Sequence, residues 1–275
     1  MPHTISRAAR AIGLGAASFG LIGASFALAQ PSSASPRSAP TLDHFLCYSS
    51  TGRGYHVPKE VQLLNALQPA PFIPTIGAVA AHCNPANKSV PVALFKALNP
   101  KAHLLCWAIQ YPNFPNTNVQ LTNQFGQGVM TAKPPTRLCL PTWKSLRGPP
   151  KEPTKQPPRL DHFTCYPLTV IPGAYAFKAP SFVKVEDEFS YPKYVQVRIG
   201  VADSLCVPTI KVVAGVAYKP QSPTDKSLMC FPEFTTPIKK LVYDLNQFGT
   251  GRVFPTQKFE HLCLPTTVVV KTGTA

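Results

Sequence analysis

Residues 103–144 contain three short motifs in a fixed order: HLLCW from His103, VQLTNQFG from Val119 and TRLCLPTWK from Thr136. The same order occurs four times in the chain. The opening motif returns as HFLCY from His44, HFTCY from His162 and SLMCF from Ser227. A closing cysteine motif follows each opening, as HCNPANK, LCLPTWK, LCVPTIK and LCLPTTV. The sequence therefore predicts four homologous units, each with one opening and one closing cysteine.

The N-terminus resembles a secretory signal. Arg7 and Arg10 precede an apolar, small-residue run over residues 11–28, and Ala27-Leu28-Ala29 forms a small-x-small cleavage site. A membrane anchor is the alternative, but the run contains several glycines and is shorter than the ~20 strongly apolar residues that a membrane span needs. We therefore predict a signal peptide over residues 1–29 and an exported protein, secreted or extracellular, with the periplasm and the cell envelope as further destinations. No transmembrane segment is expected in the mature chain.

Export decides how the cysteines are interpreted, because oxidising compartments favour disulfides over metal-bound or catalytic thiols. The repeat favours one bridge within each unit. Pairing between units, such as Cys83 with Cys106, is the alternative. Each within-unit bridge would close a loop of about 35 to 40 residues and stabilise the fold by just under ~4 kcal/mol in the chain-entropy model. The predicted structural pairs are Cys47–Cys83, Cys106–Cys139, Cys165–Cys206 and Cys230–Cys263.

Each unit is predicted to contain three strands. The opening motif is short, apolar and aromatic, which is typical of a strand. The middle motif, such as VQLTNQF from Val119, alternates between apolar and polar residues like a half-buried strand. Its fifth residue is polar in every unit, and Asn and Asp favour turns, so we expect the strand to bend there. These residues are Asn65, Asn123, Asp187 and Asn246. A repeated ligand-binding amide is the alternative role.

A third strand leads to each closing cysteine, and a proline lies two residues beyond it, at Pro85, Pro141, Pro208 and Pro265. Proline has no amide hydrogen for the ladder, so it is expected to end the strand or to mark an edge. The apolar segments between units 1 and 2 and between units 3 and 4 are predicted to add a strand that ties two units together.

The predicted organisation is all-β with two modules. Residues 30–41 form a flexible leader, and the Pro-rich residues 145–159 form a linker. Residues 42–144 form the first module, from units 42–88 and 103–144, and residues 160–271 form the second, from units 160–211 and 226–271. A single unit is too small to bury a secure core, so each module is expected to be a disulfide-stapled β-sandwich or barrel of two units.

With the four units in view, the chain resembles an uncharacterised family of exported prokaryotic proteins. That family has tandem copies of an opening H-F-x-C-Y, a middle V-x-L-x-[DN]-Q-F-G and a closing L-C-x-P-x-x-K. The second unit matches best. The first has Ala66-Leu67-Gln68 at Gln-Phe-Gly, the third has Glu188-Phe189-Ser190, and the fourth lacks the opening histidine and the closing lysine. The resemblance implies export and a domain of unknown function, and it adds no activity.

Candidate chemistry is sparse. The His-x-x-Cys motifs, with His82 and His261 near closing cysteines, could supply four zinc ligands, but the disulfides compete for the same sulfurs, so no metal and no cofactor are expected. Glu186 and Glu188 would share one face of a strand, with Asp187 on the other, where they could hold a cation or act on a sugar. A solvated strand face is the simpler interpretation. The sequence has no G-x-S-x-G and no Gly-rich phosphate loop.

Binding is assigned to the variable segments that follow the opening motifs, because loops are where sites are grafted onto a scaffold. The net charge of +15 is carried by singly spaced Lys and Arg. We predict a non-enzymatic exported binding module, whose partner is an anionic glycan, a cell surface or an extracellular protein rather than a nucleic acid. A structural, protease-resistant surface protein and a hydrolase are the alternatives. Candidate ligand-binding residues are the loop aromatics Tyr55, Tyr111, Phe114, Tyr175, Phe177 and Phe234.

Overall fold

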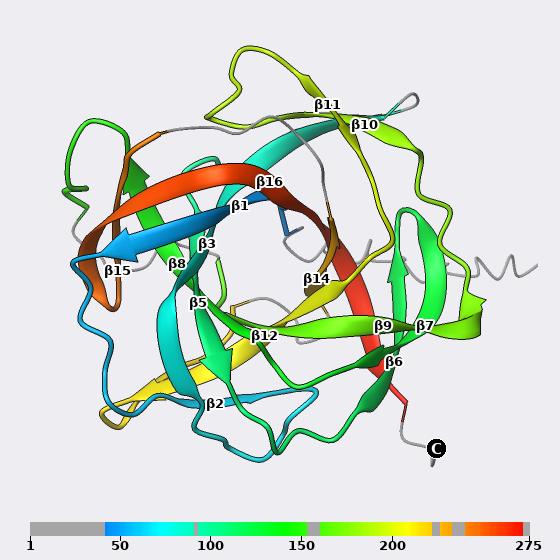
Figure 1. The fold of residues 1–275 in the computed structure, drawn as a ribbon, viewed down its shortest axis with the longest axis horizontal. Helices are drawn as coiled ribbons and strands as arrows, with labels where there is room; N and C mark the ends of the chain where they lie inside the picture. The colour runs from blue at the N-terminus through cyan, green and yellow to red at the C-terminus, as the bar shows by residue number, and fades with distance from the viewer. Residues whose placement is uncertain (1–41, 91–92, 153–159, 222–225, 233–239, 272–275) are drawn as a thin grey trace, which may run out of the picture. The chain divides into compact units, whose positions relative to one another are not determined.

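The computed structural model describes residues 42–90, 93–152, 160–221, 226–232 and 240–271. The predicted signal peptide and leader lie outside these ranges, as do residues 153–159 of the predicted linker. The described residues fold as strands without a helix, which confirms the all-β class. They belong to one compact unit, Ser38–Ala275 (Figure 1).

Each predicted unit contributes an opening and a closing strand, and all of these strands pair with one another. The opening strands are β1 (His44–Arg53), β5 (His103–Gln110), β9 (Phe163–Tyr175) and β14 (Lys226–Pro232). The closing strands are β3 (Thr75–Val90), β8 (Arg137–Ser145), β12 (Ser204–Val213) and β16 (Gly249–Val270). Antiparallel pairings run in the order β1, β3, β5, β8, β9, β12, β14, β16 and back to β1. The strands therefore form a closed ring with the four units in sequence around it.

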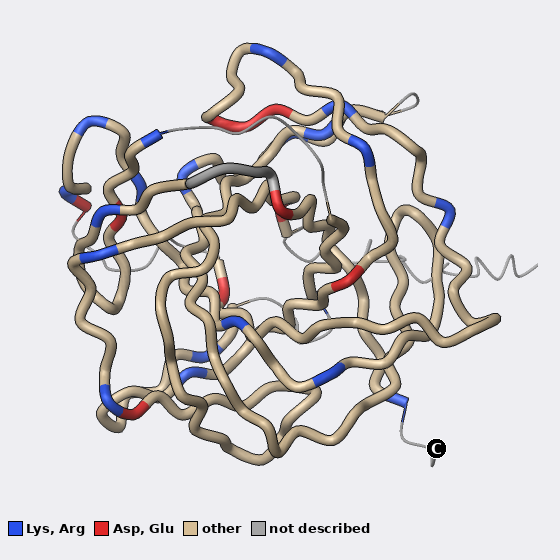
Figure 2. The backbone as a smooth tube through the Cα atoms, viewed as in Figure 1, with Lys and Arg blue, Asp and Glu red and all other residues tan. Residues whose placement is uncertain are grey.

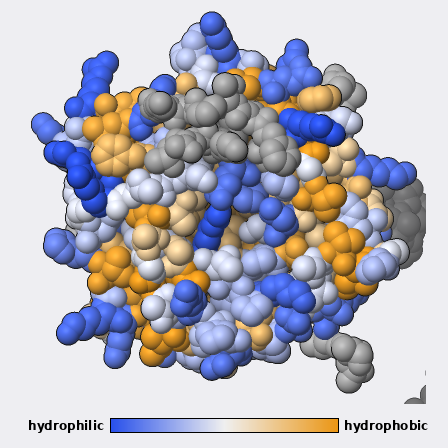
Figure 3. All heavy atoms as spheres, in the orientation of Figure 1, coloured by the Kyte–Doolittle hydropathy of each residue, from blue (hydrophilic) through white to orange (hydrophobic). Residues whose placement is uncertain are grey.

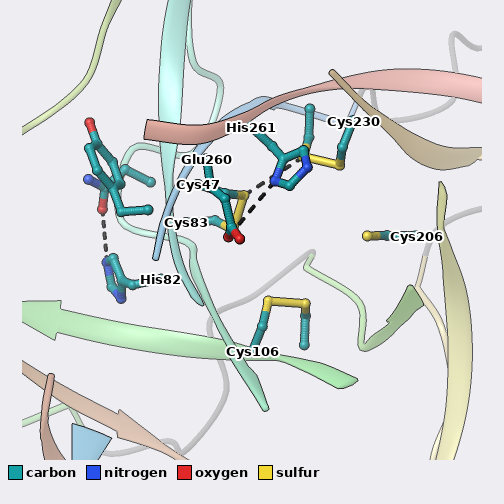
Figure 4. Close-up of a disulfide and its surroundings, with 12 residues drawn as sticks. Cys47, His82, Cys83, Cys106, Cys206, Cys230, Glu260 and His261 are labelled. Atoms are coloured by element: carbon teal, nitrogen blue, oxygen red, sulfur yellow. Dashed lines mark hydrogen bonds and ion pairs between the residues drawn. A yellow bond between two sulfur atoms is a disulfide. The ribbon is translucent and has the colours of Figure 1, made fainter. Parts of the chain in front are cut away.

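The four disulfides lie inside this ring. In every unit the two cysteines face each other across the opening and closing strands, with their Cα atoms 3.9 to 4.0 Å apart. The bonds are Cys47–Cys83, Cys106–Cys139, Cys165–Cys206 and Cys230–Cys263, one within each unit. All eight ring strands contribute cysteines or apolar side chains to one buried cluster, which therefore fills the inside of the ring. The labelled cysteines converge there in Figure 4.

Bridges of neighbouring units touch each other. The Sγ atoms of Cys47 and Cys263 are 3.8 Å apart, and those of Cys139 and Cys165 are 3.7 Å apart. The first unit is thereby in sulfur contact with the fourth, and the second with the third. The space left among the sulfurs is only about 20 Å³, roughly the room for one water molecule. Because strand side chains alternate, the neighbours of the cysteines, such as Leu46 and Tyr48, point into a second hydrophobic cluster outside the ring.

The middle strands are β2 (Gln62–Asn65), β6 (Thr117–Asn123), β10 (Phe182–Glu186) and β15 (Val242–Asn246). Each pairs with the closing strand of the unit opposite in the ring: β2 with β12, β6 with β16, β10 with β3 and β15 with β8. Units 1 and 3 thus exchange middle strands, and so do units 2 and 4. Three of these strands also form hairpins, β6 with β7 (Gly126–Ala132), β10 with β11 (Val195–Arg198) and β15 with β16.

The polar fifth residue of each middle motif forms the predicted turn. Its side-chain oxygen accepts the backbone N–H two residues later, over distances of 2.8 to 3.0 Å, in Asn65, Asn123, Asp187 and Asn246. Three of these side chains also hydrogen bond to the opposite unit, as Asn65 does to the hydroxyl of Tyr166. Gly126 and Gly249 follow with φ of +124° and +106°, which a residue with a Cβ rarely adopts. These turn contacts account for the recurrence of Asn or Asp at this position without a ligand-binding role.

The proline after each closing cysteine does not end the strand, because all four closing strands run on past it. The edge interpretation is the correct one. Pairing with the next unit stops at the closing cysteine in all four cases, at Cys83, Cys139, Cys206 and Cys263. The proline therefore occupies the first stretch where the closing strand has lost that neighbour, so that a missing N–H breaks no ladder there.

The segments between units form extra strands, as expected, but these strands fold back on their own unit instead of tying two units together. β4 (Ala93–Phe95) pairs with the end of β3, and β13 (Val216–Tyr218) pairs with the end of β12. Whether residues 42–144 and 160–271 fold as independent modules stays a prediction. In the structure their strands belong to one sheet, because β8 pairs with β9 and β16 pairs with β1.

Basic residues are spread singly along the trace, and a continuous acidic segment follows the end of β10 (Figure 2). On the face seen in Figure 3, hydrophobic residues are scattered among hydrophilic ones. The described residues contain no helix long and apolar enough to cross a membrane.

Candidate ligand-binding site at the unit junctions

The opening histidine and the closing lysine of one unit meet the middle turn of the next unit. At the first–second junction, His44 and Lys88 meet Gln124 and Phe125. The second–third junction brings His103 and Lys144 to Glu188 and Phe189. The third–fourth junction brings His162 and Lys211 to Gln247 and Phe248. The same chemistry is therefore built three times around the ring.

Two of the three lysines are enclosed by aromatic rings of the chain itself. The Nζ atom of Lys88 lies 4.5 Å from the ring centroid of Phe95 and 5.2 Å from that of Phe125. That of Lys211 lies 4.9 Å from Tyr218 and 5.0 Å from Phe248. Both lysines are fully buried, and neither Nζ has a hydrogen-bond partner among the described residues. Burial lowers the pKa of each amine to about 7.

The junction histidines are uncharged at neutral pH. Burial, together with the charge of Lys88, lowers the pKa of His44 to about 3. Burial and the charge of Lys211 do the same to His162, and burial and Lys144 hold the pKa of His103 well below its usual range. Neutral imidazole keeps one nitrogen as a donor and the other as an acceptor, so each histidine acts here as a hydrogen-bonding group.

The fourth–first junction lacks all of these residues. The fourth unit has Ser227 in place of the histidine and Val268 in place of the lysine, and the first unit has Ala66-Leu67 in place of Gln-Phe. The departures from the repeat in the first and fourth units, which are far apart in the sequence, therefore correspond to one location in the ring. The junction that lost its lysine also lost the aromatic residue that covers a lysine elsewhere.

The second–third junction differs from its two counterparts because its middle turn carries a carboxylate. The Nζ atom of Lys144 lies 2.7 Å from Glu188 Oε2 and donates to Asn84 Oδ1 at 2.6 Å. Lys144 has no exposed side-chain surface, whereas the Glu188 side chain is 46% exposed. Burial lowers the pKa of Lys144, and the charge of Glu188 opposes that shift. Glu188 is thus a solvent-facing acid anchored to a buried cation.

Below this pair lies a connected set of buried polar groups. Asn84 Oδ1 is 3.0 Å from His82 Nε2 and 3.1 Å from His103 Nδ1, and Asn84 Nδ2 donates to Asp187 Oδ2 at 2.7 Å. The hydroxyl of Tyr48 donates to the same carboxylate oxygen at 2.7 Å. A network in which buried groups satisfy one another is rigid, so it fixes the orientation of the residues above it.

An open cavity of about 510 Å³ lies over this network. Its wall includes His103, Lys144 and the three acids Glu186, Asp187 and Glu188. Glu152 contributes a fourth carboxylate to the wall. Lys101, Trp143 and Tyr191 line the cavity as well. At the other two junctions, hairpins β3–β4 and β12–β13 bring Phe95 and Tyr218 over the lysine and within 5.3 and 5.8 Å of the histidine ring. After β8, the described residues 146–152 form no strand, so no corresponding hairpin caps this junction among the described residues.

The acidic residues Glu186, Asp187 and Glu188 therefore line the site, but they do not lie together on one strand as the sequence suggested. The strand ends at Glu186, and the backbone turns at Asp187, so the two glutamates reach one cavity across a turn. Glu186 is nearly buried and accepts a hydrogen bond of 2.8 Å from Asn87. The solvated strand face expected from the sequence is wrong for Glu186.

The five predicted loop aromatics among the described residues lie elsewhere and pack against the main core. Phe114 and Phe177 are buried, with Phe114 against Tyr166. Tyr111 packs on Phe72, and Tyr175 packs on Phe177. The ring of Tyr55 lies edge-on to Trp107 and over Gly251, where any Cβ would come within 2.2 Å of it. Phe234 lies outside the described residues. The aromatic residues that line the candidate cavity, besides His103, are instead Trp143 and Tyr191.

Among the described residues, no group of histidine, cysteine and acidic side chains is arranged to hold a metal ion. All eight cysteines are in disulfides, and His82 and His103 are joined through Asn84. His261 lines the space among the sulfurs and lies beside Glu260, 3.9 Å away (Figure 4). Its Nε2 atom is 2.9 Å from Asp203 Oδ1. The histidines thus serve hydrogen-bond networks.

The closing lysines and the residues of the Asn84 network were not among the functional residues predicted from the sequence. A signal for the lysines was present, because a lysine five residues after a closing cysteine recurs in three units together with the opening histidine.

Comparison of the chain with protein-family models, curated proteins and solved structures finds no match.

Proposed function

We propose that this protein is an exported, non-enzymatic glycan-binding module whose ligand occupies the open cavity at the second–third junction. The observation that carries the proposal is that the chain builds the same junction three times and covers the lysine of two copies with an aromatic ring of the following hairpin. The third copy has no such cap among the described residues, and its cavity is about 510 Å³. A pocket of this size suits a small ligand or a few sugar rings.

The chemistry of the cavity supports a ligand rich in hydroxyl or amine groups. Carboxylates are acceptors for O–H and N–H donors, and this cavity has four of them beside only two lysines. Because Lys144 is already paired with Glu188, an anionic ligand has little free positive charge to bind here. The rings of Trp143 and Tyr191 add flat apolar surface against which a sugar ring can pack. The disulfide-stapled ring below is consistent with an extracellular location.

Replacing Glu188 by Gln is expected to weaken binding of a glucosamine trimer about tenfold or more, because it removes the exposed carboxylate of the cavity and keeps its shape. The dissociation constant is measured by isothermal titration calorimetry, after a screen of neutral, amine-bearing and acidic oligosaccharides has established binding to the wild-type protein. Glu60→Gln, at an exposed acid of the first unit, is the matched control. Circular dichroism confirms that both variants are folded.

Loss of affinity in both variants, or in neither, would contradict the assignment of the site. The absence of any oligosaccharide ligand in the screen would instead favour a structural, protease-resistant surface protein. An affinity for the oligosaccharide that falls as salt is added would indicate an electrostatic component of binding.

Hydrolysis of a glycan is the second candidate, because Glu186, Glu188 and His103 line one cavity. Two carboxylates flanking a glycosidic bond are the usual catalytic pair of glycosidases. Incubation of the bound oligosaccharide with the wild-type protein and with Glu186→Gln decides between the two, since hydrolysis requires that products accumulate only with the wild type.

A further inference from the structure

A second cavity, of about 320 Å³, lies at the first–second junction and occupies the position that the open cavity has at the next junction. Its wall contains His44, Gln124 and Pro265. In the repeat these residues correspond to His103, Glu188 and Pro85, which line the open cavity. Each cavity is therefore built from three consecutive units of the ring: the opening strand of one, the closing strand of the unit before it and the middle turn of the unit after it.

The second cavity differs from the first in charge. Its only carboxylate among the described lining residues is that of Asp43, whose two oxygens accept the backbone N–H groups of Leu98 at 2.6 Å and Asn99 at 2.9 Å. Gln124 is the neutral counterpart of Glu188, with its Nε2 atom 3.3 Å from His44 Nε2. Lys96 is exposed on the wall. This cavity thus has one carboxylate, held by two backbone N–H groups, and one exposed lysine, whereas the open cavity has four carboxylates beside two lysines.

The aromatic cap supplies the floor of this cavity. Phe95 covers Lys88 with one face, at 4.5 Å, and also lines the cavity, 5.3 Å from the His44 ring. Leu42 and Leu98 add apolar wall beside it. A sugar ring with one carboxylate would pack a C–H face on Phe95 and place its carboxylate toward Lys96 and the amide of Gln124.

We propose that this cavity is a second carbohydrate site, selective for an acidic sugar such as a uronic acid. This inference rests on the proposed glycan-binding function and adds to it a site of opposite charge preference on the same chain. Two sites that prefer different charges would let the protein bind a mixed-charge polysaccharide at two points, with the gain in avidity that linked sites give.

The test is a calorimetric titration of the full mature chain with two probes, a galacturonate trimer and a glucosamine trimer. Lys96→Glu reverses the charge of the second cavity at an exposed position, and Lys59→Glu makes the same change at an exposed lysine elsewhere in the first unit. We expect Lys96→Glu to weaken galacturonate binding at least tenfold and to leave glucosamine binding within twofold of the wild type. Lys59→Glu is expected to change neither, and Glu188→Gln to affect only the glucosamine trimer.

Galacturonate binding that is unchanged in Lys96→Glu would overturn the second site, as would binding of the glucosamine trimer alone. In both cases the open cavity and the proposed function would stand. Failure of both trimers to bind the wild-type protein would instead overturn the proposed function together with this inference.

Discussion

Replacing Lys88 and Lys211 by methionine is expected to remove a pronounced rise in the stability of the protein between pH 7 and pH 9. The pKa of each amine is lowered from 10.5 to about 7 by burial among apolar and aromatic groups. Over this interval the unfolded chain binds more protons than the folded chain, so raising the pH favours folding. The expected gain is about 2 kcal/mol for each lysine, with the aromatic rings, which favour the charged form, reducing it somewhat.

Methionine suits these positions because it is unbranched, apolar and similar in length to lysine. At pH 7 the two substitutions should also stabilise the protein, since lowering the pKa of a lysine from 10.5 to about 7 costs about 4 kcal/mol of stability at that pH. The measurement is urea unfolding at pH 7, 8 and 9, followed by circular dichroism. The window stops at pH 9 because buried tyrosines such as Tyr166, whose pKa is raised by burial, add an opposite trend at higher pH.

Lys59→Met, at an exposed lysine, is the control and should leave the pH dependence as in the wild type. A wild-type stability that stays flat from pH 7 to pH 9 would contradict the enclosure of Lys88 and Lys211. A double variant that keeps the full rise would contradict it as well.

Removal of the Cys106–Cys139 bridge by substituting both residues with alanine is expected to destabilise the protein by about 4 kcal/mol or more. The bridge closes 33 residues, for which the chain-entropy model gives just under ~4 kcal/mol. Loss of the sulfurs also leaves a cavity among tightly packed neighbours, because Cys139 Sγ is 3.7 Å from Cys165 Sγ. Urea unfolding under non-reducing conditions measures the change.

The Cys165→Ala and Cys206→Ala pair should give a similar loss, since its bridge closes 41 residues and lies in the same cluster. A loss below about 1 kcal/mol in both variants would show that the bridges neither restrict the unfolded chain nor fill the ring. Combining all four substitutions should give less than the sum, because the two bridges touch each other.

Much of the local structure could be predicted because the same three motifs recur in four units. The strands, the within-unit cysteine pairs and the Asx turns at Asn65 and Asn246 depend on residues close in the sequence, or on a pairing that the repeat itself proposes. For Pro85 and its counterparts, the sequence left two roles open, the end of a strand or an edge, and only the edge role is correct. Proline excludes a hydrogen bond on one side of a strand, and which side has a neighbour is a property of the whole sheet.

The ring and the open cavity could not be predicted from local patterns. Exchange of middle strands between opposite units, as between β2 and β12, joins residues more than a hundred positions apart, such as Asn65 and Thr209. Neither motif contains a residue pattern that identifies its pairing partner. The cavity likewise depends on which hairpin covers which junction. The one available hint was the joint loss of the histidine and lysine from the fourth unit and of Gln-Phe from the first.

The most direct test of the ring is a forced disulfide between the first and last units. In the double variant Cys83→Ala, Cys230→Ala, the remaining Cys47 and Cys263 belong to different units, and their sulfurs are 3.8 Å apart in the closed ring. Peptide mapping of the non-reduced variant should find a Cys47–Cys263 bridge in most of the molecules. Free thiols at both positions, with the variant still folded, would show that the first and fourth units are not neighbours and would contradict the closed ring.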